Sequence, residues 1–191
     1  MRRIGITGGI GSGKSVVSRL LRIMGYSVYD TDSKAKRLME SSLEVVQKLS
    51  ECFGRDIYHN GRLNRGLLSS RVFGESDKIV LLNSIVHPVV RFDFYRWSES
   101  LNEEICFVES AILYESRFDE LVDEVWTVTA PEELRISRVR QRSGLTEEEI
   151  KKRMAAQLSE EEKQRRAAHI IWNDGNVSVI HRVLSLLKSL E

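Results

Sequence analysis

The sequence predicts an α/β protein in which helices cover both faces of a parallel sheet. Five short apolar runs, each typical of a buried strand, alternate with segments whose apolar residues recur at helical spacing. The runs are residues 4–7, 27–29, 105–108, 125–129 and 169–172. Strands that alternate with helices in this way pair in parallel, and such sheets bind ligands at the carboxyl ends of their strands.

Length, charge and cysteine usage exclude several classes of protein. The chain has 191 residues, with 29 Lys and Arg against 28 Asp and Glu, so we expect one domain whose phosphate-binding charge is local rather than spread over a nucleic-acid or membrane surface. No apolar run approaches the ~18 residues of a membrane span, and the apolar start is too short for a signal peptide. Cys52 and Cys106 match no metal or redox spacing, so we expect both in or near the core of a cytoplasmic protein.

The first predicted strand runs into a glycine-rich segment, Gly8-Gly9-Ile10-Gly11-Ser12-Gly13-Lys14-Ser15, which is followed by a helical pattern from Val16 to Met24. The pattern Gly8-x-x-x-x-Gly13-Lys14-Ser15 between a strand and a helix is a phosphate-binding P-loop. Its glycines turn backbone N–H groups around the phosphates, Lys14 reaches the β/γ oxygens, and the Ser15 hydroxyl ligates Mg²⁺. We therefore expect the nucleotide to be held by Gly8, Gly9, Gly11, Ser12, Gly13, Lys14, Ser15 and Val16.

Motifs outside the P-loop, and the length of the chain, indicate which nucleotide it binds and which class of protein it belongs to. The sequence contains neither the Asp-x-x-Gly nor the Asn-Lys-x-Asp segment of GTPase switches, which favours ATP. A motor or AAA-type ATPase is usually longer, and Phe107-Val108-Glu109 matches its acidic strand end only in part. The size fits a small-molecule kinase best.

The remaining elements divide the chain into a core and two inserts. Helices are expected after the second strand over 35–49, over 65–97 with a break near Gly74 and with Pro88 at a helix start or kink, after Pro131, and over 177–190. Residues 132–166 are highly charged and predict a solvated helical hairpin rather than core. The core is then 1–30, 104–131 and 167–191, and the inserts are 31–103 and 132–166.

Motifs along the whole chain point to one family. They are Thr7 to Ser15, Val28-Tyr29-Asp30-Thr31-Asp32, Gly61-x-Leu63-x-Arg65, Val86-His87-Pro88, Leu113-Tyr114-Glu115, Arg138, Arg142, Gln157, Lys163 and Asn173-x-Gly175. Together they resemble the dephospho-coenzyme A kinase family. The chain departs from the family pattern at Val16, Asn64, Ser110-Ala111-Ile112 and Ala168.

The resemblance implies an adenylate-kinase-like fold with a five-stranded nucleotide-binding core, a helical acceptor-binding insert within 31–103 and a mobile lid within 132–166. It also implies the reaction: transfer of the ATP γ-phosphoryl group to the ribose 3′-hydroxyl of dephospho-coenzyme A. The P-loop serine adds the expectation of Mg²⁺, and the near-neutral charge argues against nucleic-acid and membrane partners. We expect a monomer or small homo-oligomer.

Phosphoryl transfer depends mainly on positioning and charge neutralisation, but the acceptor hydroxyl must lose its proton to a nearby carboxylate. Asp32, at the end of the second predicted strand, is our candidate base. Asp30 competes with it, and its alternative roles are a helix N-cap or a water-mediated magnesium contact. Arg138 and Arg142, four residues apart, present two forked donors to phosphate, unless they pair with nearby acidic residues.

We expect Arg65, His87, Leu113 and Glu115 to contact the acceptor and Asn173 to hydrogen-bond adenine. Each polar member of this group has a structural alternative: His87 at a helix end, Glu115 in an ion pair, Asn173 in a loop turn. Two other functions stay open, namely another small nucleoside or nucleotide kinase and a non-catalytic protein that uses ATP as a switch.

Overall fold

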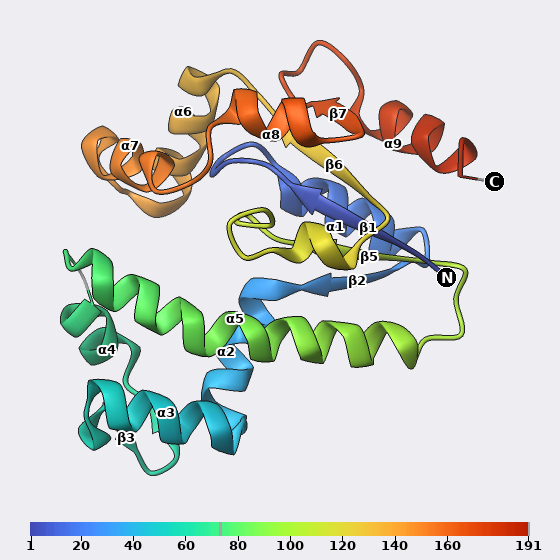
Figure 1. Ribbon diagram of the computed structural model, residues 1–191. Helices are drawn as coiled ribbons and strands as arrows, with labels where there is room; N and C mark the ends of the chain where they lie inside the picture. Colours follow the sequence, from blue (N-terminus) through green and yellow to red (C-terminus); the bar gives the residue numbers. More distant parts are fainter. Residues whose placement is uncertain (73, 191) are drawn as a thin grey trace. The chain divides into compact units, whose positions relative to one another are not determined.

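A computed structural model describes residues 1–72 and 74–190 and divides them into two compact units (Figure 1). Unit 1 is Met1–Tyr29 together with the chain from Asn102 onward, and unit 2 is Asp30–Leu101. Phe73, within the helical range expected at 65–97, lies outside the described residues.

Unit 1 is built on the predicted sheet. In the described part of the chain this sheet has five strands in the order β2-β5-β1-β6-β7. Their bounds are β1 Arg2–Thr7, β2 Ser27–Asp30, β5 Ile105–Glu109, β6 Glu124–Thr129 and β7 His169–Trp172. Central β1 is parallel to β5 on one side and to β6 on the other, and β6 is parallel to β7. The fold class that the sequence predicts is therefore confirmed.

The alternation of side chains along β1 explains how the two faces of the sheet are covered. Ile4 and Ile6 are fully buried on the face where α1 (Lys14–Ile23) and α9 (Val179–Lys188) contribute Val17, Leu21 and Val183 to one core cluster. Gly5 points to the other face, where Leu113 and Val122 pack over it. That face is closed near β1 by the segment after β5, which includes the 3₁₀ helix η2 (Phe118–Leu121).

Residues 132–166 differ from the solvated hairpin expected from their charge. The structure describes all of them, and they form three helices, α6 (Glu132–Ser143), α7 (Glu147–Ala155) and α8 (Glu160–Arg166). Ile136, Val139 and Ile150 form a small buried cluster between α6 and α7. The expectation was wrong because the few apolar residues are concentrated on facing sides, and because charged side chains are buried there as well.

Unit 2 is mainly helical. Its elements are α2 (Thr31–Ser41), α3 (Leu43–Phe53), η1 (Arg55–Ile57), β3 (Tyr58–His59), β4 (Arg62–Leu63), α4 (Arg65–Val72) and α5 (Ser76–Glu99). The loop expected at Gly61 is the tip of a hairpin in which Asn60 and Gly61 both have positive φ, as a two-residue turn requires. Pro88 lies inside α5 and not at its start, so the long helix tolerates the missing N–H.

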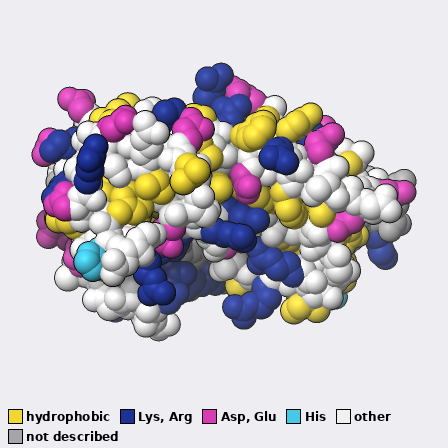
Figure 2. All heavy atoms as spheres, turned by 90° about the horizontal axis from the view of Figure 1, so that it is seen from below, with side chains coloured by type: hydrophobic (Ala, Val, Ile, Leu, Met, Phe, Trp, Pro, Cys, Tyr) yellow, Lys and Arg dark blue, Asp and Glu magenta, His cyan; other side chains and the backbone are white. Residues whose placement is uncertain are grey.

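The surface charge and the two cysteines can be compared with what the sequence predicts. Figure 2 shows Lys and Arg side chains among Asp, Glu and hydrophobic ones on the face it presents, in keeping with the formal charge of +1. Within residues 1–72 and 74–190, no helix has the length and apolar character needed to cross a membrane. Cys106 is buried, which raises the pKa of its thiol to about 11. Cys52 is exposed, so placing it in or near the core was wrong.

Candidate active site

The glycine-rich loop between β1 and α1 is a tight cradle that has no room for side chains. Gly11 and Gly13 adopt φ values of 81° and 101°, a left-handed conformation that favours glycine. A Cβ atom on Gly11 would lie 2.5 Å from the carbonyl oxygen of Arg135, and one on Gly13 would overlap the side-chain amide of Asn173. The backbone can therefore approach its neighbours, and a ligand, as closely as a phosphate cradle requires.

The start of α1 supplies donors and positive charge to this cradle. Gly13 is the N-cap and has no side chain to bond the N–H groups of the first turn. Lys14 Nζ donates to the carbonyl oxygens of Gly8, at 2.7 Å, and Gly9, at 3.3 Å, so the amine lies across the loop. Ser15 and Val16 are exposed in the first helical turn. This donor set fits a bound phosphate chain.

Asn173, the predicted adenine contact, lies beside the loop and makes its hydrogen bonds here with the protein. Its side-chain Nδ2 donates to the carbonyl oxygen of Ser12 at 2.8 Å, and its backbone N donates to the Thr129 oxygen at 2.8 Å. The residue thereby connects the ends of β6 and β7 to the cradle. A hydrogen bond from Asn173 to adenine stays a prediction.

A buried ion pair that no sequence pattern indicated supports the loop from the side of α6 and α8. Arg135 Nη1 lies 3.3 Å from Glu160 Oε1, with side-chain exposures of 7% and 12%. Thr129 Oγ1 donates to the second Glu160 oxygen at 2.9 Å. A Cβ atom on Gly9 would overlap both charged groups. Because the two residues are far apart in the sequence, no local spacing announces the pair.

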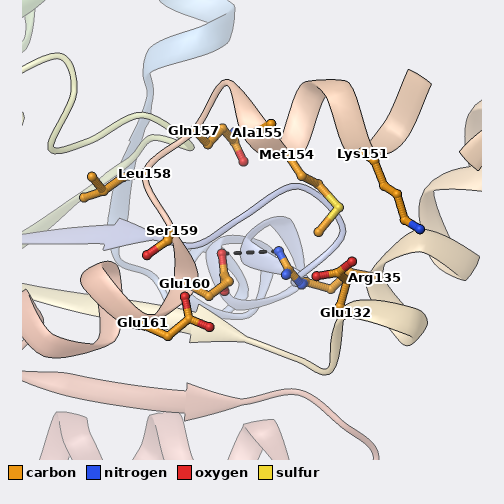
Figure 3. A pocket seen from close by; sticks show the side chains of 10 residues that line it. All are labelled: Glu132, Arg135, Lys151, Met154, Ala155, Gln157, Leu158, Ser159, Glu160 and Glu161. Carbon is orange, nitrogen blue, oxygen red and sulfur yellow. Dashed lines mark ion pairs between the residues drawn. The ribbon is translucent and has the colours of Figure 1, made fainter. Parts of the chain in front are cut away.

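A cavity of about 420 Å³ opens beside this ion pair (Figure 3). Its lining residues come from α6, α7, α8 and the turn 156–159: Glu132, Arg135, Lys151, Met154, Ala155, Gln157, Leu158, Ser159, Glu160 and Glu161. In Figure 3 the guanidinium of Arg135 and the carboxylate of Glu160 point toward each other. The segment that the sequence predicts as a lid therefore has a hollow lined by both charged and apolar side chains.

The two predicted arginines of this segment are both on α6. Arg142 is exposed in the last turn, whereas Arg138 is half-buried and its Nη1 has no hydrogen-bond partner among the described residues. Two of the nearby acidic residues have other partners: Glu147 pairs with Lys151 at 2.7 Å, and Glu149 forms a capping box with Thr146. A desolvated guanidinium N–H suits a phosphate oxygen.

Two predicted acceptor contacts in unit 1 have structural roles here. Leu113 is fully buried and packs over Gly5, so a contact between its side chain and substrate stays a prediction that this structure does not support. Glu115 Oε1 accepts from the backbone N–H of Leu158 at 2.6 Å and lies 3.8 Å from the Nζ of Lys163. The ion-pair alternative for Glu115 is thus present, and its contact with substrate also stays a prediction.

In unit 2 the two competing aspartates differ. Asp30 is the N-cap of α2, and its carboxylate accepts from the Ser33 backbone N–H at 3.1 Å and from the Ser33 hydroxyl at 2.8 Å. Asp32 is exposed in the first turn of that helix.

The two predicted acceptor contacts of unit 2 are Arg65 and His87. Arg65 donates to Glu40 Oε1 at 3.1 Å and to the Lys36 carbonyl oxygen at 3.2 Å. His87 is half-buried within α5.

Magnesium has few protein ligands available. Within the described part of the chain, no three His, Cys, Asp or Glu side chains gather in a way that could hold a metal ion. Mg²⁺ commonly keeps several waters and is bound by one or two protein groups together with substrate phosphates. The exposed Ser15 hydroxyl beside the cradle fits that mode, and this role for Ser15 stays a prediction.

Comparisons with known proteins point to one family. The sequence model of the family described as dephospho-CoA kinase matches residues 2–178. The dephospho-CoA kinase of Porphyromonas gingivalis is 40% identical over 191 residues, which cover 100% of this chain and 95% of that protein. The one from Bacteroides fragilis is 41% identical over 189 residues, which cover 98% and 92%.

Solved structures agree with these matches. A crystal structure titled TT1252 from Thermus thermophilus has a TM-score of 0.86 and 36% identity, covering 99% of this chain and 97% of that one. A dephospho-CoA kinase from Campylobacter jejuni, with a TM-score of 0.74 and 23% identity over 100% of this chain and 98% of that one, shows the fold alone. The family match and the 40% identity, both spanning nearly the whole chain, establish that this protein belongs to the dephospho-CoA kinase family.

Proposed function

We propose that this chain transfers the γ-phosphoryl group of ATP to the ribose 3′-hydroxyl of dephospho-coenzyme A, giving coenzyme A and ADP in the last step of coenzyme A synthesis. As a member of the dephospho-CoA kinase family it is a kinase. The observation that carries the proposal is the glycine cradle at the carboxyl end of β1, with Lys14 across it and the open N-terminus of α1 beside it.

The cradle binds the triphosphate. The backbone N–H groups at the start of α1 point toward the β-phosphate, and Lys14 exchanges its contacts with the Gly8 and Gly9 carbonyls for phosphate oxygens. Bound Mg²⁺ would supply positive charge that neutralises the triphosphate, and the Ser15 hydroxyl would be its protein ligand. The side chains present here hold and orient the phosphates; they form no covalent intermediate.

The acceptor hydroxyl oxygen attacks the γ-phosphorus while the bond from that phosphorus to the β–γ bridging oxygen breaks. The electron pair of the broken bond leaves with ADP, and the hydroxyl proton passes to a carboxylate. We assign this base to Asp32. The N-cap contacts of Asp30 support the choice, because both Asp30 oxygens are already engaged with Ser33, whereas Asp32 is exposed.

Arg138 and Arg142 stabilise the charge that develops on the transferred group. Their positions on one side of α6, and the unpartnered Nη1 of Arg138 among the described residues, support this role. We propose that residues 132–166 act as a lid that excludes water from the γ-phosphoryl group during transfer.

We propose that unit 2 contains the predicted acceptor-binding insert at 31–103 and that Arg65 and His87 contact dephospho-coenzyme A there. The Arg65 guanidinium, now bonded to Glu40 and to the Lys36 carbonyl, supplies a forked donor for a phosphate. Burial, and then the charge of Arg91, lowers the pKa of His87 from 6.5. His87 therefore meets the acceptor as a neutral imidazole at pH 7.

We also propose a cytoplasmic protein that is a monomer or small homo-oligomer and has no nucleic-acid or membrane partner. The mixed surface charge supports this proposal. The two other functions are a different small-molecule kinase and an ATP-dependent binding protein. Shikimate kinase from Acinetobacter baumannii shares the fold, with a TM-score of 0.57 and 15% identity, so the scaffold alone does not select the acceptor.

The acceptor is tested with purified protein, ATP and Mg²⁺ against dephospho-coenzyme A, adenosine, AMP and shikimate. ADP release is followed by a coupled assay, and the phosphorylated product is identified by mass spectrometry. We expect turnover with dephospho-coenzyme A alone. Phosphorylation of another acceptor in its place would establish a different kinase, and ATP binding without any phosphorylation would establish a binding protein.

Replacement of the proposed base tests its role in the proton transfer. Asp32→Asn is expected to lower turnover by about 10²–10⁴-fold with a modest change in ATP binding, because the amide cannot accept the proton. Asp30→Asn is the matched control: asparagine caps helices about as well as aspartate, so its turnover should stay far above that of Asp32→Asn. Wild-type turnover in Asp32→Asn contradicts the assignment.

Titration of His87 tests its protonation state. Because the folded pKa lies below 6.5, the unfolded chain takes up the proton first, and stability is lost as the pH falls from 6.5 through the folded pKa. We expect an NMR titration midpoint for the His87 imidazole below 6.5 and a higher midpoint in Arg91→Ala. His87→Gln should lose this part of the pH dependence of unfolding. A wild-type midpoint at or above 6.5 contradicts the prediction.

A further inference from the structure

The turn at residues 156–159, between α7 and α8, is bonded directly to the phosphate cradle. The side-chain oxygen Oε1 of Gln157 accepts from the backbone N–H of Ile10 at 3.0 Å. Ile10 is the third residue of the loop that begins at Gly8. A residue of the proposed lid thus bonds the backbone of the loop that holds the nucleotide.

The same turn is held from a second side. Leu158, the next residue, donates its backbone N–H to Glu115 Oε1 at 2.6 Å. Lys163, which is fully buried, lies 3.8 Å from that oxygen and donates to the carbonyl oxygen of Ala111 at 3.1 Å. The segment after β5 therefore fixes the backbone at Leu158 independently of the cradle. The side chain of Gln157 is presented to Ile10 from a backbone that is already restrained.

The chemistry of the contact fixes the orientation of the amide. A backbone N–H only donates, so the group that faces Ile10 must be the side-chain oxygen, and the two N–H donors of Gln157 lie on its other branch. The amide is neutral. A carboxylate in place of the Gln157 amide would repel the negative charge of a nearby triphosphate. An ammonium group there would bind the phosphate equally well before and during transfer, and would therefore not favour the transfer step.

We propose that Gln157 is a positioning residue for phosphoryl transfer: by holding the Ile10 amide, it keeps the turn 156–159 seated on the phosphate cradle and directs the γ-phosphoryl group to the acceptor rather than to water. This inference rests on the proposed kinase function. The contact anchors the turn between α7 and α8 of the proposed lid to the loop, while α6 carries Arg138 and Arg142. A lid that is loose at this anchor admits water to the phosphoryl group.

The experiment removes the acceptor oxygen without a large change in side-chain volume. In Gln157→Leu we expect the turnover of dephospho-coenzyme A to fall about tenfold and the ratio of ATP hydrolysis to transfer to rise about tenfold, with the KM for dephospho-coenzyme A within about twofold of wild type. Gln141→Leu, the same substitution at an exposed position on α6, should leave turnover and ratio unchanged.

Amide hydrogen exchange measures directly whether the Ile10 N–H is hydrogen-bonded to Gln157. The Ile10 amide should be protected in the wild type and exchange about tenfold faster in Gln157→Leu, but not in Gln141→Leu. A purely structural role for Gln157 would lower the melting temperature and leave the hydrolysis-to-transfer ratio unchanged, which would overturn the inference. Unchanged Ile10 exchange in Gln157→Leu would also overturn it. Failure of the proposed function shows separately, as a wild-type protein that does not phosphorylate dephospho-coenzyme A.

Discussion

The arrangement of unit 1 depends on a loop whose glycines leave no room for a side chain. A Cβ atom on Gly8 would overlap the Val128 carbonyl oxygen of β6, one on Gly9 would overlap the Arg135–Glu160 pair, and one on Gly13 would overlap Asn173. Three elements that are distant in the sequence, β6, the α6–α8 segment and the loop after β7, thus meet the cradle within van der Waals contact. The glycines that form the phosphate cradle are therefore also the residues against which these three elements pack.

This constraint explains why the proposed lid is rooted where it is. The backbone of Arg135 lies directly against Gly11, and the buried Arg135–Glu160 pair connects α6 to α8 beneath Gly9. Removing one member of such a pair leaves a desolvated charge, which is costly. The Gln157 contact with Ile10 adds a neutral link to the same loop. Together these contacts fix α6, the helix that carries Arg138 and Arg142, to the nucleotide cradle.

The structural features that could be predicted from the sequence are those with local signals. Continuous apolar runs gave the five strands, and the glycines with Lys14 and Ser15 gave the cradle, because each depends on neighbouring residues. The helix cap by Asp30 was open as an alternative, since an aspartate before a helix has a recognised geometry. Family motifs marked Gln157 and Lys163 but not their contacts.

What could not be predicted depends on residues brought together by folding. Ile10 and Gln157 are 147 positions apart, and the Arg135–Glu160 pair crosses two helices, so neither has a spacing that a sequence pattern reveals. The buried side of residues 132–166 was hidden by their high charge. Leu113 looked available to a substrate, but tertiary packing over Gly5 buries it.

The most direct test of the central claim is the affinity of Gly11→Ala for ATP, measured by calorimetry beside Gly25→Ala. Both glycines have positive φ, 81° and 93°, so alanine is strained at each. Only at Gly11 does the new Cβ atom meet a backbone, the Arg135 carbonyl at 2.5 Å, whereas at Gly25 nothing described lies within 4 Å. We predict at least about tenfold weaker ATP binding for Gly11→Ala, equivalent to about 1.4 kcal/mol, and a change within about twofold for Gly25→Ala. Wild-type affinity in a folded Gly11→Ala protein would contradict the account.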